Sequence, residues 1–134
     1  MKSYISHIQI NIKQENNSFY KELFKFLGFE VLMDFEMGTG YKNSVDKTSV
    51  WTMHTTNTGT PDYDLTGVNH IGFAANTIEE VDEIAKWLKS KNIPALFDTP
   101  RHRPEFSGED ETYYQVMFET PDKLLLEIVY TGKK

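Results

Sequence analysis

The sequence predicts an α+β fold in which one pattern, β-α-β-β-β, occurs twice along the chain. Two observations predict it. Stretches that alternate between apolar and polar residues, as half-buried strands do, occur at 6–12 and 69–75, and each precedes a stretch with helical periodicity. Three further strand-like stretches then follow each helix. We expect the two modules to form a cup-shaped, partly open barrel of mixed sheet with the helices outside.

The first module, residues 1–60, opens with a strand that has two distinct faces. Ile8, Ile10 and Ile12 fall on one side, and His7 begins the polar side. A helix is predicted next, because Phe19, Leu23, Phe26 and Leu27 share one helical face and Gly28 is typical of a C-terminal cap. Strands are then expected over residues 29–35, 38–43 and 48–56.

The second module, residues 61–134, follows a join at 57–67 that is rich in Gly, Pro, Asp and Thr and is typical of a linker. Its opening strand places His70 on the polar side. A helix is predicted from Thr77, because Thr77 and Glu80 have the spacing of a capping box. Strands are then expected over residues 93–97, 112–118 and 123–130.

Composition excludes several classes of function. The 134-residue chain has a net charge of −6 and no basic run, so nucleic acid and anionic membranes are not expected partners. It contains no cysteine, which excludes disulfides, thiolate metal sites and a cysteine nucleophile. No apolar stretch approaches the roughly 20 residues needed to span a bilayer, and the N-terminus does not resemble a signal peptide. We expect a cytoplasmic protein.

Three polar residues stand out on the faces that the helices are not expected to cover. His7 and His70 head matching strands, and Glu127 interrupts the apolar run LLLEIV. Two imidazoles and one carboxylate suit a divalent metal and leave coordination positions open for a substrate. Singly, each has a plainer explanation: a strand cap near solvent, a satisfied core histidine, and a carboxylate at a sheet edge. Their matched placement in a duplicated pattern favours the metal site.

The order of these motifs resembles the vicinal oxygen chelate superfamily, which includes glyoxalase I, extradiol dioxygenases and bleomycin- and fosfomycin-resistance proteins. The resemblance covers residues 4–130 and rests on HIQINI, FYKELFKFLGFEV, GVNHIGFAANTIEEVDEIAKWLKSKNI and YYQVMFETPDKLLLEIVY. It implies a histidine at the start of each module and a glutamate in the last strand, which are His7, His70 and Glu127 here. The turn before that strand is PDK, with Lys123 where the family usually has glycine.

A fourth metal ligand in the first module is where the chain departs from the glyoxalase pattern. Family members of the glyoxalase and epimerase type place a glutamate or glutamine in the strand 48–56, and the pattern aligns Thr52 with that position. A threonine hydroxyl is a poor ligand for these metals. His54, two residues further on, is an alternative cavity residue, and so is a strand-end histidine with no ligand role.

The segment 98–114 is predicted to be a long irregular loop, and such loops are often functional. Arg101 and Arg103 lie in it, and arginine suits recognition of a carboxylate or phosphate. A solvated loop with internal ion pairs is the alternative. In the strand that follows, Tyr113 and Gln115 share one face and are the predicted cavity residues.

Three functions remain open at this point. The first is a metal-dependent enzyme, either a lyase or isomerase, in which Zn, Ni, Mn, Fe or Mg chelates a small oxygenated substrate and Glu127 moves a proton. The second is a metal-free binding protein of the bleomycin-resistance type, and the third is a dioxygenase or a fosfomycin-resistance-like transferase. In each case the resemblance implies a small-molecule partner and a homodimer.

Overall fold

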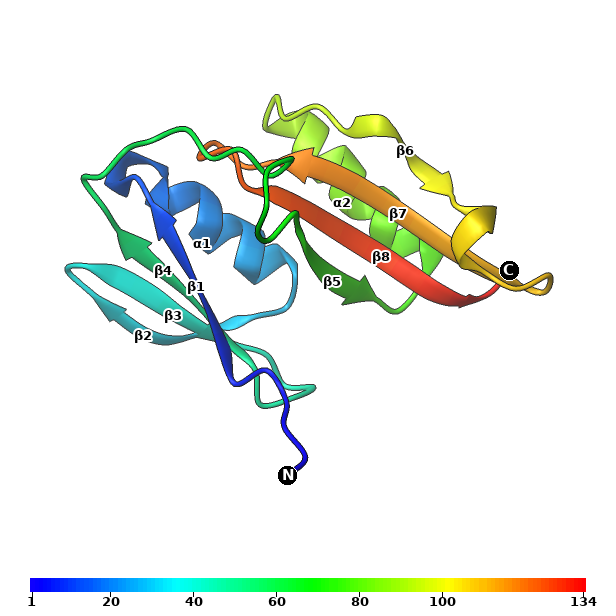
Figure 1. The fold of residues 1–134 in the computed structure, drawn as a ribbon, viewed down its shortest axis with the longest axis horizontal. Coiled ribbons are helices and arrows are strands. Elements are labelled where there is room, and N and C mark those ends of the chain that lie inside the picture. The colour runs from blue at the N-terminus through cyan, green and yellow to red at the C-terminus, as the bar shows by residue number, and fades with distance from the viewer. The chain divides into compact units, whose positions relative to one another are not determined.

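The computed structural model describes all residues 1–134 and divides into two compact units, residues 1–59 and 60–134. Each unit is an α+β module in which a four-stranded mixed sheet carries one helix, as predicted (Figure 1). The strand order is β1-β4-β3-β2 in unit 1 and β5-β8-β7-β6 in unit 2. The two orders are equivalent, so the repeat seen in the sequence is a repeat of topology.

Unit 1 contains one helix, one 3₁₀ turn and four strands. In chain order these are β1 (His7–Ile12), η1 (Gln14–Asn16), α1 (Asn17–Phe26), β2 (Glu30–Phe35), β3 (Gly38–Lys42) and β4 (Ser49–His54). β1 pairs with β4 in parallel, and the β4–β3 and β3–β2 pairs are antiparallel. The bounds lie close to the predicted ones.

The core of unit 1 forms between α1 and one face of its sheet. Ile12, Leu23 and Phe24 are fully buried, and the ring of Phe24 lies 4.6 Å from that of Tyr41 on β3. The helix ends as the sequence predicts. Gly28 has a φ of +79°, a conformation that glycine adopts without strain, and the next N–H donates to the Phe24 carbonyl at 2.8 Å.

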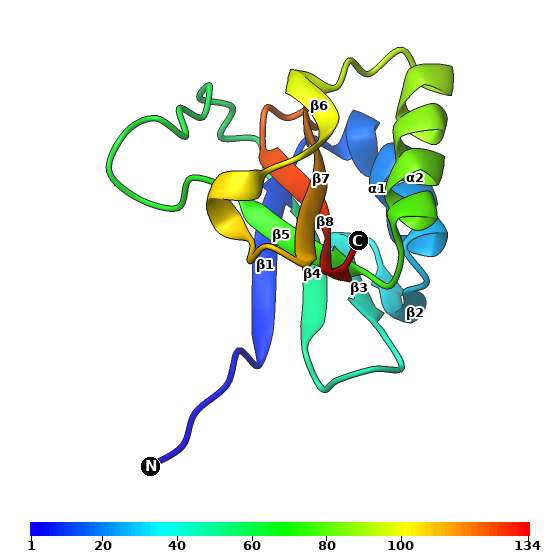
Figure 2. The ribbon, with the colours of Figure 1, turned by 90° about the vertical axis from the view of Figure 1, so that its right-hand side faces the viewer.

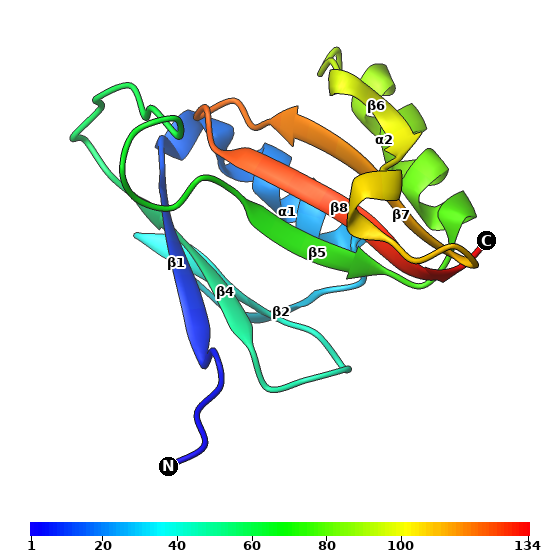
Figure 3. The ribbon, with the colours of Figure 1, turned by 45° about the vertical axis from the view of Figure 1, so that its right-hand side comes forward.

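Unit 2 repeats this arrangement with longer strands. Its elements are β5 (Ile71–Ala75), α2 (Ile78–Ser90), β6 (Leu96–His102), η2 (Pro104–Phe106), β7 (Glu111–Glu119) and β8 (Leu125–Lys133). Figure 3 shows β5, β8 and β7 side by side, and in Figure 2 α2 lies on one side of β7 and β8 while the η2 turn lies on the other. The segment that follows β6 therefore borders the sheet face opposite α2.

The two helices are amphipathic and short. They have 10 and 13 residues, and neither is long and apolar enough to cross a membrane. In α2 the buried stripe is Val81, Ile84 and Leu88. Thr77 caps its N-terminus by accepting from the Glu80 N–H, as predicted, but the Glu80 carboxylate accepts from the Asn76 N–H at 2.7 Å instead of closing back on Thr77.

β6 differs most from prediction. A strand was expected over 93–97 and a loop over 98–114, whereas β6 spans Leu96–His102. Ile93 instead lies in the turn that follows α2 and caps it, since its N–H donates to the Leu88 carbonyl. Phe97 and Asp98 both have a φ of +56°, which breaks the alternation that would mark a strand. Pro100 lacks an N–H and is tolerated because β6 is an edge strand.

An ion pair joins α1 to β2 in unit 1. The Lys21 ammonium donates to Asp34 Oδ2 at 2.6 Å, and the Thr39 hydroxyl donates to Oδ1 at 2.8 Å. These bonds, that of Lys21 first, lower the pKa of Asp34 below 3.8. A carboxylate with a lowered pKa stabilises the fold fully above its unfolded-state pKa and loses that contribution as the pH falls through its folded-state pKa.

We therefore expect Asp34→Asn to lower the midpoint of thermal unfolding at pH 7. The difference from the wild type should begin to shrink as the pH falls below about 3.8, where the unfolded chain takes up a proton at Asp34. It should vanish only below the lowered pKa of the folded state, where both proteins carry a neutral group at this position. Differential scanning calorimetry from pH 7 to pH 2 measures it. Glu36→Gln, at an exposed carboxylate in the turn after β2, is the matched control and should change the midpoint little at any pH.

Candidate functional site

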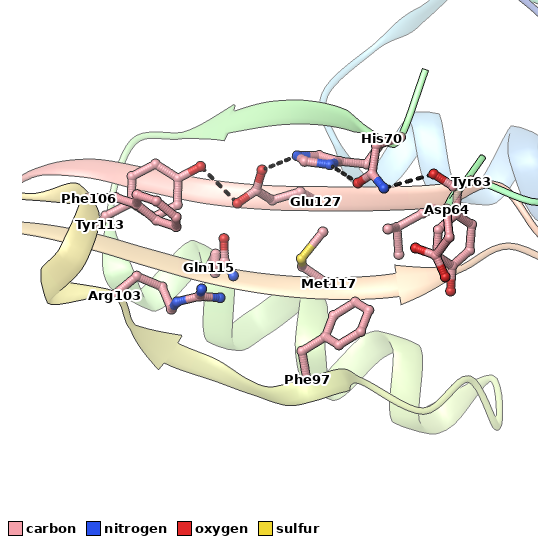
Figure 4. A pocket seen from close by; sticks show the side chains of 12 residues that line it. Tyr63, Asp64, His70, Phe97, Arg103, Phe106, Tyr113, Gln115, Met117 and Glu127 are labelled. Carbon is pink, nitrogen blue, oxygen red and sulfur yellow. Dashed lines mark hydrogen bonds and ion pairs between the residues drawn. The ribbon is translucent and has the colours of Figure 1, made fainter. Parts of the chain in front are cut away.

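A pocket of about 440 Å³ lies in unit 2, on the sheet face opposite α2 (Figure 4). Its floor is formed by alternate residues of the two central strands, Gln115 and Met117 of β7 and Leu125 and Glu127 of β8. The remaining lining residues are Tyr63, Asp64, Asn69, His70, Phe97, Arg103, Phe106 and Tyr113. The predicted alternation in β7 and β8 thus places Tyr113, Gln115 and Glu127 in one cavity.

Glu127 is a buried carboxylate with an exposure of only 3%. The Tyr113 hydroxyl donates to its Oε1 at 2.9 Å, and His70 Nε2 lies 3.1 Å from its Oε2. Gly72 pairs with Glu127 across the β5–β8 ladder, and a Cβ at Gly72 would lie 3.3 Å from Oε2. The absence of a side chain at Gly72 therefore leaves the space in which the carboxylate approaches the imidazole.

Gln115 links this carboxylate to a guanidinium. Its amide is almost fully buried and is oriented so that the NH₂ donates to Glu127 Oε1 and the carbonyl accepts from Arg103 Nη1 at 3.0 Å. Glu127 thus receives neutral donors on Oε1 and has no direct contact with Arg103. A charge buried in this way is costly unless a proton or a cation compensates it.

Arg103 stands at the other end of this chain of contacts. Its Nε donates to Glu105 Oε1 at 2.5 Å, and its guanidinium lies 5.2 Å from the centre of the Phe106 ring. With Nε and Nη1 engaged, Nη2 has no protein partner. Since a guanidinium pairs readily with carboxylates and phosphates, Arg103 can hold an anionic group at the edge of the pocket.

Tyr113 remains a hydrogen-bond donor across the ordinary pH range. Burial, together with the bond to Glu127, raises the pKa of Tyr113 to about 12. Its ring also lies 5.5 Å from that of Phe106 in an edge-to-face arrangement. The tyrosine is therefore fixed at both its hydroxyl and its ring.

The structure separates the two predicted arginines. Arg103 lines the pocket, whereas Arg101 is exposed on β6 and does not line it. Several lining residues were not singled out from the sequence. Tyr63 and Asn69 lie in or next to the predicted linker, Phe97 ends the predicted strand 93–97, and Phe106 lies in the predicted loop 98–114. None of these positions carries a pattern that marks it as part of a site.

His7 lies in unit 1, at the start of β1, and its Nδ1 is 3.3 Å from the Ser6 hydroxyl. The two ladders allow a comparison of the units. Gly72, two residues after His70, pairs with Glu127, and Gln9, two residues after His7, pairs with Trp51. Trp51 is therefore the unit 1 counterpart of Glu127. Its ring packs on Gly40, where an added Cβ would lie only 2.7 Å from the nearest ring carbon.

Thr52 and His54 therefore do not occupy the predicted cavity position. Thr52 pairs with Ile10 and His54 with Ile12, so both lie on the face that α1 covers, opposite to His7. Thr52 is fully buried and donates to the Thr39 carbonyl at 3.3 Å. The family pattern assigned Thr52, and with it His54, to the cavity, whereas on this strand the residues of the open face are Trp51 and Met53.

Within neither unit do three His, Asp or Glu side chains come together as a metal site. His70 and Glu127 form a pair, and the set of His7, His70 and Glu127 draws on both units. That set stays a prediction.

Comparison with known proteins identifies relatives. The model of the Glyoxalase/Bleomycin resistance protein/Dioxygenase superfamily matches residues 5–128. A glyoxalase-like protein from Bacillus halodurans is 30% identical, with 94% of each chain covered and a TM-score of 0.78. The fosfomycin resistance protein FosX from Listeria monocytogenes is 22% identical, covers 97% of this chain and 94% of its own, and has a TM-score of 0.69. No curated protein matches the sequence.

The close approach at Gly72 yields a prediction. Gly72→Ala should push the Glu127 carboxylate away from its place and lower the free energy of unfolding by about 1 kcal/mol, the low end for overpacking. Urea denaturation of the metal-free protein measures this. Gly108→Ala is the control, since a Cβ there would meet its nearest neighbour at an ordinary 3.6 Å, and its effect should stay within about 0.5 kcal/mol. Equal stabilities of the two variants would contradict the packing argument.

Proposed function

The chain belongs to the Glyoxalase/Bleomycin resistance protein/Dioxygenase superfamily, and from this we propose that it is a metal-dependent enzyme that acts on a small, oxygenated and anionic substrate. One observation carries the proposal. Glu127 is a buried carboxylate that opens onto a pocket beside an imidazole, with no cationic side chain bonded to it. Burying such a charge costs folding free energy unless a cation compensates it, so the position suits a residue that binds a cation.

The residues present fit a divalent cation. His70 Nε2 and Glu127 Oε2 converge to 3.1 Å at the pocket, and they are the nitrogen and oxygen donors that a borderline-hard cation accepts. Tyr113 and Gln115 bind the other carboxylate oxygen, Oε1, and so leave Oε2 available. We propose His7 as the third ligand, from the matching position in unit 1.

Each pocket residue has a distinct role in this proposal. When bound, a divalent cation supplies Lewis-acid polarisation of two neighbouring substrate oxygens. Arg103 binds the anionic group of the substrate through Nη2 and so fixes its orientation. Tyr113 and Gln115 hold the Glu127 carboxylate in one rotamer with Oε2 toward the cation. Glu127 would accept or return a proton at Oε2 only while that oxygen is not bound to the cation. The apolar side chains of Met117 and Leu125 exclude water from this part of the floor.

A metal-free binding protein of the bleomycin-resistance type is the second candidate. The observation that favours it is the aromatic and aliphatic part of the lining, Phe97, Phe106, Met117 and Leu125, which suits an apolar ligand. The likeness to FosX would fit a fosfomycin-resistance-like transferase, and the superfamily name also admits a dioxygenase.

We also propose that the protein is a homodimer. Val31, Leu32 and Met33 on the edge strand β2 are each about half exposed, and a second copy that covers them would remove a contiguous apolar strand from water.

Metal titration tests the proposed function. Isothermal titration calorimetry with Zn²⁺, Ni²⁺, Mn²⁺ and Co²⁺, on protein freed of metal with a chelator, should show about one tight site per chain. His7→Ala, His70→Ala and Glu127→Ala should each abolish this site. The chain offers matched controls in its two other histidines. His54→Ala and His102→Ala should retain the metal, because His54 lies under α1 and His102 is bonded to Thr112.

The metal-dependent enzyme would be rejected if the folded wild type binds none of these metals. If it also binds ligands equally well with and without chelator, the metal-free binding protein is the function that remains. Retention of metal by Glu127→Ala would contradict the assigned site.

The role of Arg103 is tested separately, without knowledge of the substrate. In thermal-shift measurements with a panel of small carboxylates and phosphonates, any compound that stabilises the wild type should bind Arg103→Gln at least 10-fold more weakly, since a charge-assisted hydrogen bond contributes about 1.5–3 kcal/mol. Arg101→Gln is the matched control and should bind as the wild type does. Equal losses in both variants would indicate a general electrostatic effect of the acidic chain instead of a specific contact.

A further inference from the structure

The contacts around His70 extend beyond the pocket into the segment 60–69, which the sequence marks only as a linker. His70 Nδ1 lies 2.7 Å from Asn69 Oδ1, and Asn69 Nδ2 donates to the Tyr63 carbonyl at 2.9 Å. The Tyr63 hydroxyl in turn donates to Glu119 Oε1 at 2.7 Å, at the end of β7. Residues 60–69, which we call the strap, are thus tied both to β7 and to the histidine.

The orientation of the Asn69 amide follows from its partners. A backbone carbonyl only accepts hydrogen bonds, so the group of Asn69 that faces the Tyr63 carbonyl must be the NH₂. The group that faces His70 is then the carbonyl oxygen, which also only accepts. For this contact to be a hydrogen bond, His70 Nδ1 must carry a proton.

The consequence lies at the other ring nitrogen. In the neutral imidazole one nitrogen carries the proton and the other a lone pair. With the proton on Nδ1, the lone pair is on Nε2, which faces Glu127 Oε2 at 3.1 Å. Without Asn69, the better arrangement would be the opposite one, with the proton on Nε2 donated to the Glu127 carboxylate.

We propose that Asn69 is a positioning residue, which holds His70 in the tautomer with the proton on Nδ1 and so keeps Nε2 free for a cation or for substrate. This inference rests on the proposed role of His70 in the site. Outer partners of this kind typically change metal affinity by 10–100-fold when they are removed.

The anchor of the strap explains how an exposed asparagine keeps one orientation. Glu119 accepts from Tyr63 and from the Lys123 ammonium at 3.0 Å, and these bonds lower the pKa of Glu119, that of Tyr63 first. The bond to Glu119 also raises the pKa of Tyr63 to about 12, so the phenol stays a donor. Tyr63 is therefore held in place relative to the sheet. The Asn69 amide, which donates to the Tyr63 carbonyl, is held with it.

Long-range ¹H–¹⁵N NMR of the histidine rings identifies the tautomer directly, in protein freed of metal with a chelator. The His70→Gln variant assigns the His70 signals. We expect the wild type to carry its proton on Nδ1. Asn69→Ala should move the neutral ring toward the Nε2–H form, and Asn69→Asp, which keeps the acceptor but loses the bond to Tyr63, should restore the wild-type pattern. Asn57→Ala, at another exposed asparagine, is the control and should change nothing.

Metal titration of the same proteins completes the test. Binding to Asn69→Ala should be 10–100-fold weaker than to the wild type, with recovery in Asn69→Asp. An Nε2–H wild type, or an Asn69→Ala ring that stays in the Nδ1–H form, would overturn the role of Asn69. If Asn69→Ala shifts the tautomer but the wild type binds no metal, the positioning role stands and the proposed metal-dependent function falls.

Discussion

The site depends on one electrostatic constraint, a carboxylate buried in an otherwise apolar strand. Leu125, Leu126 and Ile128 surround Glu127 in β8 and are themselves buried, so water cannot solvate the charge from the strand itself. Every polar group near it is arranged in response. Tyr113 and Gln115 donate to one oxygen, His70 approaches the other, and Gly72 leaves the space for that approach. Both hydrogen-bond donors bind Oε1, and Oε2, the oxygen that the proposed cation would bind, is left facing His70.

The two units show how a duplicated module can diverge at a single position without a change of topology. At the ladder position where unit 2 has Glu127 opposite Gly72, unit 1 has Trp51 opposite Gln9. The indole lies over Gly40, whose missing side chain provides the room, and its N–H donates to the Ser49 hydroxyl at 2.9 Å. Unit 1 thus offers an aromatic surface where unit 2 offers a charge.

The sequence predicted the parts of this structure that periodicity encodes. Alternation in β1, β5, β7 and β8 and the apolar stripes of α1 and α2 located the elements. Alternation also placed Tyr113 and Gln115 on one face of β7, and Glu127 on the face of β8 opposite Leu126 and Ile128. It failed where the backbone departs from a regular period. Residues 98–102 of β6 were predicted as loop because the positive φ angles at Phe97 and Asp98 interrupt the strand. Thr52 was assigned to the cavity by the family pattern, whereas its pairing with Ile10, which only the structure shows, places it on the face under α1. Tyr63 and Asn69 could not be found by such reasoning, since their role arises from contacts that the irregular strap makes with β7 and His70.

A chain of contacts runs across the pocket from Arg103 through Gln115 to Glu127, and then through His70 and Asn69 to Tyr63 and Glu119. Each link joins a donor to an acceptor except one. Between His70 Nε2 and Glu127 Oε2, both atoms are acceptors when the ring is neutral with its proton on Nδ1 and the carboxylate is ionised. The other contacts hold these two atoms in place: Gln115 donates to Glu127 on one side, and Asn69 contacts His70 on the other. The one link that lacks a donor lies between partners held from both sides, so a positive charge at this place, from a proton or a metal ion, would complete the chain of contacts.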